Sequence, residues 1–105
     1  MNTLIEKVKM WSNERGLNNG NSDKQLLKIN EELGETVQAY LKGHQDDMKL
    51  ELGDVLVTLI IFAQQQDIDL NDCLELAYNK ISNRKGELVN GTYIKQDDLV
   101  GKVKL

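Results

Sequence analysis

The sequence lacks proline altogether and has only one cysteine and one histidine in 105 residues. Without a second cysteine the chain cannot form an internal disulfide, so Cys73 indicates a reducing compartment. A single histidine, His44, argues against a diiron bundle, which needs a Glu-x-x-His pair on each of two helices. The absence of proline is compatible with long helices, because proline interrupts helix interiors.

Long hydrophobic runs and an excess of positive charge are also missing. The longest apolar run, Val55–Ala63, is too short to cross a bilayer, and the N-terminal residues lack the apolar core of a signal peptide. We therefore expect a cytoplasmic protein without a membrane partner. The net charge of −4 and the pI of about 4.9 argue against a nucleic-acid polymer as partner, because binding the phosphate backbone requires a basic surface.

Apolar residues recur at helical spacing and predict four helices, over residues 3–15, 22–41, 46–66 and 70–84. Ser22 followed by Gln25 is a capping-box pattern that marks the start of the second helix. This helix carries an apolar stripe at Leu26, Ile29, Leu33, Val37 and Tyr40. The sequence thus predicts an all-α domain, a four-helix antiparallel bundle over residues 1–86, followed by a short irregular C-terminal tail over residues 87–105.

The third expected helix is apolar on almost every side after Asp54. A helix of this kind is buried on every side, and a chain of 105 residues cannot easily enclose it. We therefore expect this segment to pack against another subunit as well.

Two acidic motifs dominate the middle of the chain, Glu32-Leu33-Gly34-Glu35 and Glu51-Leu52-Gly53-Asp54. Residues three apart share one face of a helix, so each motif can aim two carboxylates in one direction. A turn at Gly43 between antiparallel helices would bring the pairs face to face, where they repel unless a cation lies between them. Carboxylates alone favour Mg²⁺, with Mn²⁺ as a substitute, over Zn²⁺. The alternative is two solvated acidic surfaces.

Each acidic pair is accompanied by a glycine, Gly34 or Gly53. A glycine inside a helix costs about 1 kcal/mol relative to alanine. We therefore expect a neighbouring helix or a ligand to approach the backbone closely at these positions.

Three further residues are candidates for binding. Lys80 and Arg84 lie four residues apart on the last expected helix, where they form either a clamp for phosphate oxygens or a solvated basic face near a helix C-terminus. Trp11, the only tryptophan, is either a core residue or a surface on which a base stacks.

The acidic motifs, extended to Glu31-Glu32-Leu33-Gly34-Glu35 and Glu51-Leu52-Gly53-Asp54, resemble the EExxE…ExxD signature of the MazG-like all-α nucleoside triphosphate pyrophosphohydrolases. The segment Tyr78–Gly86 is similar to the later Asn-Lys…Arg segment of that family. The resemblance implies a Mg²⁺-dependent, oligomeric enzyme that cleaves a nucleoside triphosphate between the α- and β-phosphates and releases a monophosphate and pyrophosphate.

The resemblance also implies residue roles. Glu32, Glu35, Glu51 and Asp54 would be the metal ligands, and Glu31 would orient the attacking water, so that Glu31, Glu32 and Glu35 form the catalytic group. Asn79, Lys80 and Arg84 would hold the phosphates, and Trp11 is the candidate contact for the base. Two other functions are compatible with the sequence: a non-enzymatic helical interaction module, and a hydrolase of another phosphorylated ligand.

Overall fold

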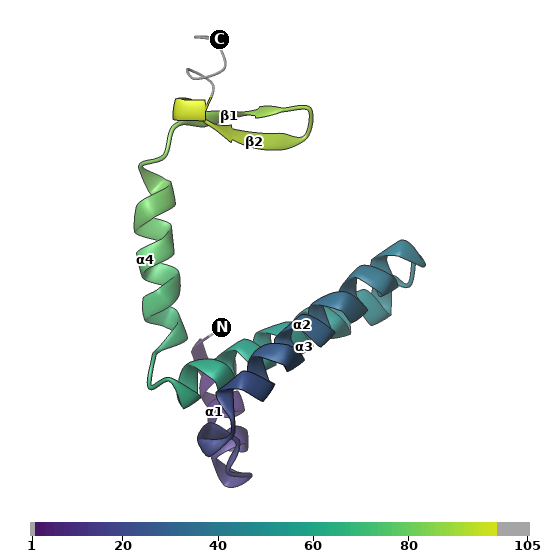
Figure 1. Ribbon diagram of the computed structural model, residues 1–105, viewed down its shortest axis with the longest axis vertical. Helices are drawn as coiled ribbons and strands as arrows, with labels where there is room; N and C mark the ends of the chain where they lie inside the picture. Colours follow the sequence, from purple (N-terminus) through teal and green to yellow (C-terminus); the bar gives the residue numbers. More distant parts are fainter. Residues whose placement is uncertain (1, 99–105) are drawn as a thin grey trace. The chain divides into compact units, whose positions relative to one another are not determined.

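The computed structural model describes residues 2–98, and these residues are mostly helical (Figure 1). The elements in chain order are α1 (Asn2–Glu14), the 3₁₀ helix η1 (Leu17–Asn19), α2 (Ser22–Leu41), α3 (Gln45–Gln65), α4 (Leu70–Ser82), β1 (Gly86–Val89) and β2 (Thr92–Lys95). The four predicted helices are confirmed close to their expected ends. The chain divides after Leu70 into two compact units. A bundle of all four helices and a domain boundary after residue 86 stay predictions.

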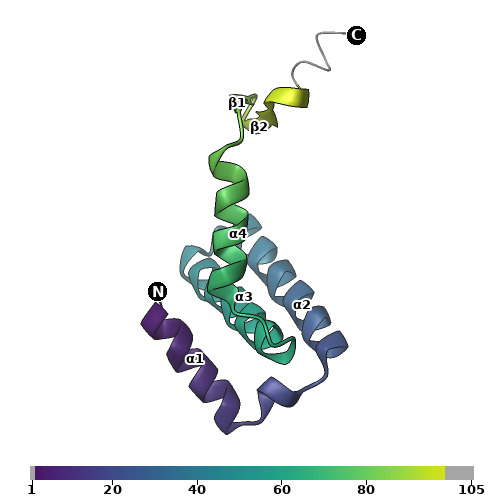
Figure 2. The ribbon, with the colours of Figure 1, turned by 90° about the vertical axis from the view of Figure 1, so that its left-hand side faces the viewer.

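The first unit is organised around α3, which contacts both α1 and α2. Helices α2 and α3 lie side by side and run antiparallel (Figure 1, Figure 2). The fully buried apolar side chains are few, and every one of the three helices contributes at least one: Ile5, Ile29, Ala39, Ile60, Ile61 and Ala63. A core this small leaves much of the apolar surface of these helices exposed.

Polar and glycine residues set the ends of α1, α2 and α3. Gly16 has φ 72° and follows α1, and Gly43 has φ 73° in the turn between α2 and α3. Both sit in the left-handed region, which glycine adopts without steric cost. The predicted capping role of Ser22 is wrong: Asn21 is the N-cap of α2, and its side chain accepts a hydrogen bond from the backbone N–H of Lys24. The Ser22 hydroxyl instead donates to Gln65 Oε1.

Gln65, near the end of α3, forms hydrogen bonds with both η1 and the first residue of α2. Its Nε2 donates to the carbonyl of Leu17 at 3.0 Å, and its Oε1 accepts from the hydroxyl of Ser22 at 3.1 Å. Each such hydrogen bond contributes about 0.5–1.5 kcal/mol net. We expect Gln65→Ala to lower the free energy of unfolding in urea by about 1–3 kcal/mol. The exposed Gln38→Ala, on α2, serves as the control and should change it by less than about 0.5 kcal/mol.

The face of α2 that packs on α3 differs from the predicted apolar stripe. Of that stripe only Ile29 is buried. The inner face instead combines Ile29 and Ala39 with half-buried Gln25, Glu32 and Thr36. The polar groups of this face have local partners: the Gln25 side chain donates to a carbonyl of α3, and the Thr36 hydroxyl donates to the carbonyl of Glu32. The acidic residues of α2 therefore lie on the intramolecular seam, while most of the stripe remains exposed.

Helix α3 exposes apolar side chains that no other described part of the chain covers. Thr58, Ile60 and Ile61 are buried, whereas the leucines nearer its start are about half exposed or more, namely Leu50, Leu52 and Leu56. Coverage of these leucines by a second copy stays a prediction. Within residues 2–98, no helix has the length and apolar character needed to cross a membrane.

The expectation of an irregular C-terminal tail is wrong for the described residues, because β1 and β2 form an antiparallel hairpin. The turn contains Asn90 at φ 51° and Gly91 at φ 81°. An Asn-Gly pair with positive φ at both positions favours a two-residue hairpin turn. The end of the predicted fourth helix also moves, since α4 ends at Ser82 and Gly86 opens β1. Residues 99–105 of the predicted tail lie outside the described residues.

Candidate metal centre

The turn between α2 and α3 determines how their acidic residues meet. The backbone N–H of His44 donates to the carbonyl of Ala39 at 2.9 Å, which closes the turn at Gly43. The two helices then run antiparallel, and α2 faces α3 with Glu32 half-buried on its inner side. The predicted convergence of acids from the two motifs is confirmed for Glu32, Glu35 and Glu51, which can each place one carboxylate oxygen within 4.8 Å of the others.

Two carboxylate oxygens of this cluster lack partners. Glu32 Oε2 and Glu51 Oε2 are buried and accept no hydrogen bond from any described residue. Glu32 and Glu51 are half-buried as residues, whereas Glu35 is exposed. Leaving a buried acceptor unsatisfied costs about 1–3 kcal/mol, and more for a charged group. The seam therefore holds acceptors that a bound cation would satisfy.

The electrostatics of the cluster also favour added positive charge. The neighbouring Glu35 carboxyl is the main cause that raises the pKa of Glu51 from 4.5 to about 7, with burial and Glu32 adding to the effect. Burial is the main cause that raises the pKa of Glu32, followed by the charge of Glu35. Each shift reflects a charged form that is disfavoured by crowding of like charges and by loss of water. A proton or a metal ion relieves this repulsion.

The raised pKa of Glu51 predicts that the metal-free protein loses stability as the pH increases. Because the folded state binds this proton more tightly than the unfolded state, the stabilising contribution is complete below pH 4.5 and is lost as the pH rises through about 7. Melting temperatures in EDTA should therefore fall between pH 5 and pH 8, approximately. Glu51→Gln should remove most of this fall, and an unchanged pH profile in that variant would contradict the assignment.

Asp54 lies close to the cluster but is not one of its three members. Its negative charge contributes to the raised pKa values of both Glu32 and Glu51. Asp54 is half-buried and lines a hollow of about 370 Å³ between α1 and α3. Glu31 is exposed and does not belong to the cluster. The predicted second acidic pair is thus divided, with Glu51 at the cluster and Asp54 at the edge of the hollow.

Trp11 lines the same hollow as Asp54 and is 43% exposed, so it is not a core residue. The guanidinium of Arg15 lies 4.5 Å from the centre of the indole ring, and Arg15 Nη1 donates to the Trp11 carbonyl at 3.1 Å. A guanidinium over an aromatic face is a favourable cation–π arrangement. Arg15 therefore holds the ring beside the hollow.

The two glycines of the acidic motifs do not have the close neighbours that we expected. A Cβ added at Gly34 or at Gly53 would meet nothing within 4 Å among the described residues. The prediction is therefore wrong for a neighbouring helix of the same chain. Approach by a ligand or by a second copy stays a prediction.

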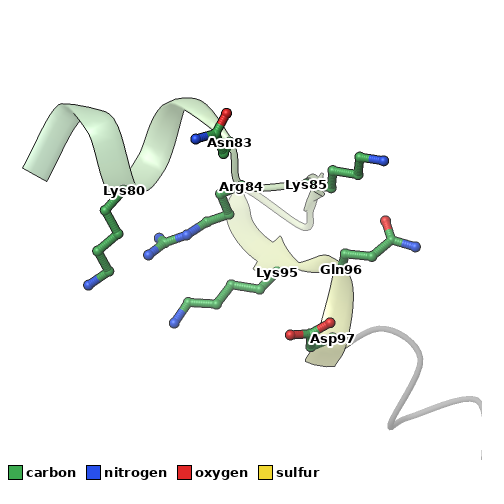
Figure 3. Close-up of a pocket in the computed structure, with 7 residues that line it drawn as sticks. All are labelled: Lys80, Asn83, Arg84, Lys85, Lys95, Gln96 and Asp97. Atoms are coloured by element: carbon green, nitrogen blue, oxygen red, sulfur yellow. The ribbon is translucent and has the colours of Figure 1, made fainter.

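The predicted basic residues lie in the second unit. Lys80 and Arg84 line a hollow of about 390 Å³ (Figure 3). Asn79 does not line it, and the Asn79 carbonyl accepts a hydrogen bond from the Ser82 hydroxyl at 3.1 Å. Sequence reasoning missed that Lys95 of β2 lines the same hollow. The Asn-Gly pair between two short β-type runs was the signal that would have indicated the hairpin and this position.

Comparisons with known proteins agree with the acidic motifs. Residues 21–89 match the MazG nucleotide pyrophosphohydrolase domain, a range that contains both acidic motifs and α4 but not Trp11. The chain is 34% identical over 67 residues to an uncharacterized 18.2 kDa protein from the rep-hol intergenic region of Haemophilus phage HP1 (strain HP1c1). That match covers 63% of this chain and 41% of the phage protein. No solved structure matches the chain. The chain belongs to the MazG nucleotide pyrophosphohydrolase domain family.

Proposed function

We propose that the protein is a Mg²⁺-dependent nucleoside triphosphate pyrophosphohydrolase, which converts a ribo- or deoxyribonucleoside triphosphate and water into the monophosphate and pyrophosphate. The observation that carries the proposal is the cluster of Glu32, Glu35 and Glu51, each of which offers one carboxylate oxygen within 4.8 Å of the other two. Family membership supports the same class of reaction.

The donor set fits a hard divalent cation. Mg²⁺ binds oxygen at about 2.1 Å, so two ligands on opposite sides of the ion are about 4 Å apart. Small rotations of Glu32, Glu35 and Glu51 would reach this spacing, and Asp54 would supply a fourth carboxylate. The partnerless oxygens of Glu32 and Glu51 are the groups that the ion would satisfy. Mn²⁺ has similar ligand preferences and should substitute, whereas Zn²⁺ normally recruits histidine or cysteine.

The residues of the site would have separate roles in hydrolysis. When bound, the cation would neutralise charge on the triphosphate and lower the pKa of a coordinated water. Glu31, exposed next to Glu32, would orient the attacking water, and a carboxylate of the group Glu31, Glu32 and Glu35 would accept its proton. Attack in line on the α-phosphorus breaks the bond to the β-phosphate oxygen, and pyrophosphate leaves.

Candidate residues for binding the substrate occur in each unit. The hollow beside Trp11 and Asp54 is the candidate site for the base, because the indole supplies an aromatic surface next to the acidic cluster. Asn79, Lys80 and Arg84 would bind the phosphates. Lys80 and Arg84 share a hollow, which supports their joint role.

Two further parts of the proposal concern assembly and location. Exposed apolar residues on α2 and α3, among them Leu33 and Leu56, support assembly as a homodimer or homotetramer. A cytoplasmic location follows from the composition and stays an expectation. Neither a nucleic-acid polymer nor a membrane is proposed as a partner.

A panel of ribo- and deoxyribonucleoside triphosphates, assayed for pyrophosphate release with Mg²⁺ and with EDTA, tests the proposed reaction. Release that requires Mg²⁺ supports it, and the ranking of the panel identifies the base and sugar. If no triphosphate is cleaved but Mg²⁺ raises the melting temperature, the protein acts on another phosphorylated ligand. At 100 times the dissociation constant, binding stabilises the folded state by about 2.7 kcal/mol. If the protein shows no pyrophosphate release and no thermal shift with Mg²⁺, the interaction module is favoured.

A further inference from the structure

The β-hairpin contributes a cation to the hollow that contains Lys80 and Arg84. Lys95 is the last residue of β2 and pairs with Gly86, the first residue of β1. The backbone N–H of Gln96 also donates to the carbonyl of Lys85, which ties the end of β2 to the segment that follows α4. The hairpin therefore holds Lys95 next to the C-terminal end of α4.

The close pairing of β1 and β2 at Gly86 leaves no space for a side chain at residue 86. A Cβ at Gly86 would collide with the carbonyl oxygen of Ile94 and with the Tyr93 side chain. Only glycine therefore allows β2 to approach so closely at the residue that pairs with Lys95. The position of Lys95 is a consequence of this close approach and not of a loose tail.

The side chains around the hollow point in two directions. Lys80, Arg84 and Lys95 extend to the same side, together with Asp97, whereas the side chains of Lys85 and Gln96 extend to the other side (Figure 3). No carboxylate of the described residues forms an ion pair with any of the three cations on the first side. Four cations line the hollow, and three of them, Lys80, Arg84 and Lys95, extend to the side where the single acidic residue, Asp97, also lies.

We infer that Lys95 is a third phosphate-binding cation, which extends the pair Lys80 and Arg84 so that the hollow binds a chain of phosphates. The inference rests on the proposed function for the identity of the ligand, the polyphosphate part of a nucleoside triphosphate. It adds a residue beyond the end of the family match at residue 89. Three converging cations suit a chain with a negative charge on each phosphate better than a single small anion.

Asp97 gives the hollow a second testable property. Its carboxylate faces the same side as the three cations and would repel an anionic ligand. Removal of this charge should therefore strengthen binding, while removal of the Lys95 charge should weaken it. Lys85 supplies a matched control, because it also lines the hollow but its side chain extends to the side opposite the other three cations.

The test measures binding of inorganic tripolyphosphate, pyrophosphate and phosphate to the full chain by titration calorimetry in EDTA, where neither Mg²⁺ nor hydrolysis contributes. We expect tripolyphosphate to bind most tightly of the three. Lys95→Gln should weaken its binding about 5- to 10-fold, because an exposed charged contact is lost. Lys95→Arg should retain binding, Asp97→Asn should tighten it, and Lys85→Gln should leave it unchanged within about twofold.

The outcomes separate this inference from the proposed reaction. Equal effects of Lys95→Gln and Lys85→Gln, or no effect of either, would overturn the role of Lys95 even if the wild-type protein cleaves triphosphates. Selective weakening by Lys95→Gln in a protein that cleaves none would support the binding site and refute the proposed reaction. In an active protein, Lys95→Gln should raise KM for the triphosphate by a similar factor.

Discussion

Glu51→Gln is expected to lower Mg²⁺-dependent pyrophosphate release by at least about 100-fold, since even residues that only orient a metal ligand are worth about 10- to 100-fold. The same variant should raise the melting temperature of the metal-free protein at pH 8. Both effects have one cause: the Glu51 carboxylate is crowded by Glu35 and Glu32, which raise its pKa to about 7. A neutral amide removes the repulsion, but it also removes the charge that would bind the cation.

The opposite signs of these two effects make the prediction specific. A general loss of structure would lower both activity and melting temperature. Mg²⁺ should raise the melting temperature of the wild-type protein and have a much smaller effect on Glu51→Gln. Glu75→Gln, at an exposed position on α4, is the control and should keep the wild-type response to Mg²⁺. A variant at Glu51 that retains full activity would exclude this residue as a metal ligand.

Leu33→Lys is expected to convert an assembled protein into a monomer. Leu33 lies in the predicted apolar stripe of α2, and it is 46% exposed in the single chain. Burial of an unpaired ammonium group in an interface costs several kcal/mol, so the dissociation constant should rise by at least about 100-fold. Sedimentation velocity at micromolar concentration would detect this change as a shift from dimer or tetramer to monomer.

The melting temperature supplies a second measurement of the same assembly. For a protein that folds and associates together, it rises with protein concentration, and this dependence should disappear in Leu33→Lys. Gln38→Lys adds the same charge at an exposed polar position of α2, away from the stripe, and should preserve the assembly. A wild-type chain that sediments as a monomer would contradict the predicted oligomer and leave the exposed leucines without a partner.

Hydrophobic periodicity predicted the helix α2 but not which of its faces packs against α3. Both are helical repeats that include Ile29, and the sequence favours the more apolar of the two as the buried one. The structure packs the other against α3, with small Ala39 and half-buried Glu32 at the contact. Packing within one chain selects the helix face that allows the two backbones to approach closely. A second copy of the chain can then cover the apolar stripe that stays exposed.

The sequence by itself determined the helices, the turn at Gly43 and the acidic motifs, because these depend on local spacing and on the conformational freedom of glycine. It also indicated the family, since the acidic motifs resemble the signature of that family and the family match covers both of them. Only the tertiary structure decided that Glu51 joins Glu32 and Glu35 while Asp54 lines the hollow beside Trp11. It also decided that Lys95 lines the same hollow as Arg84, because strand pairing, and not helical spacing, places Lys95 there.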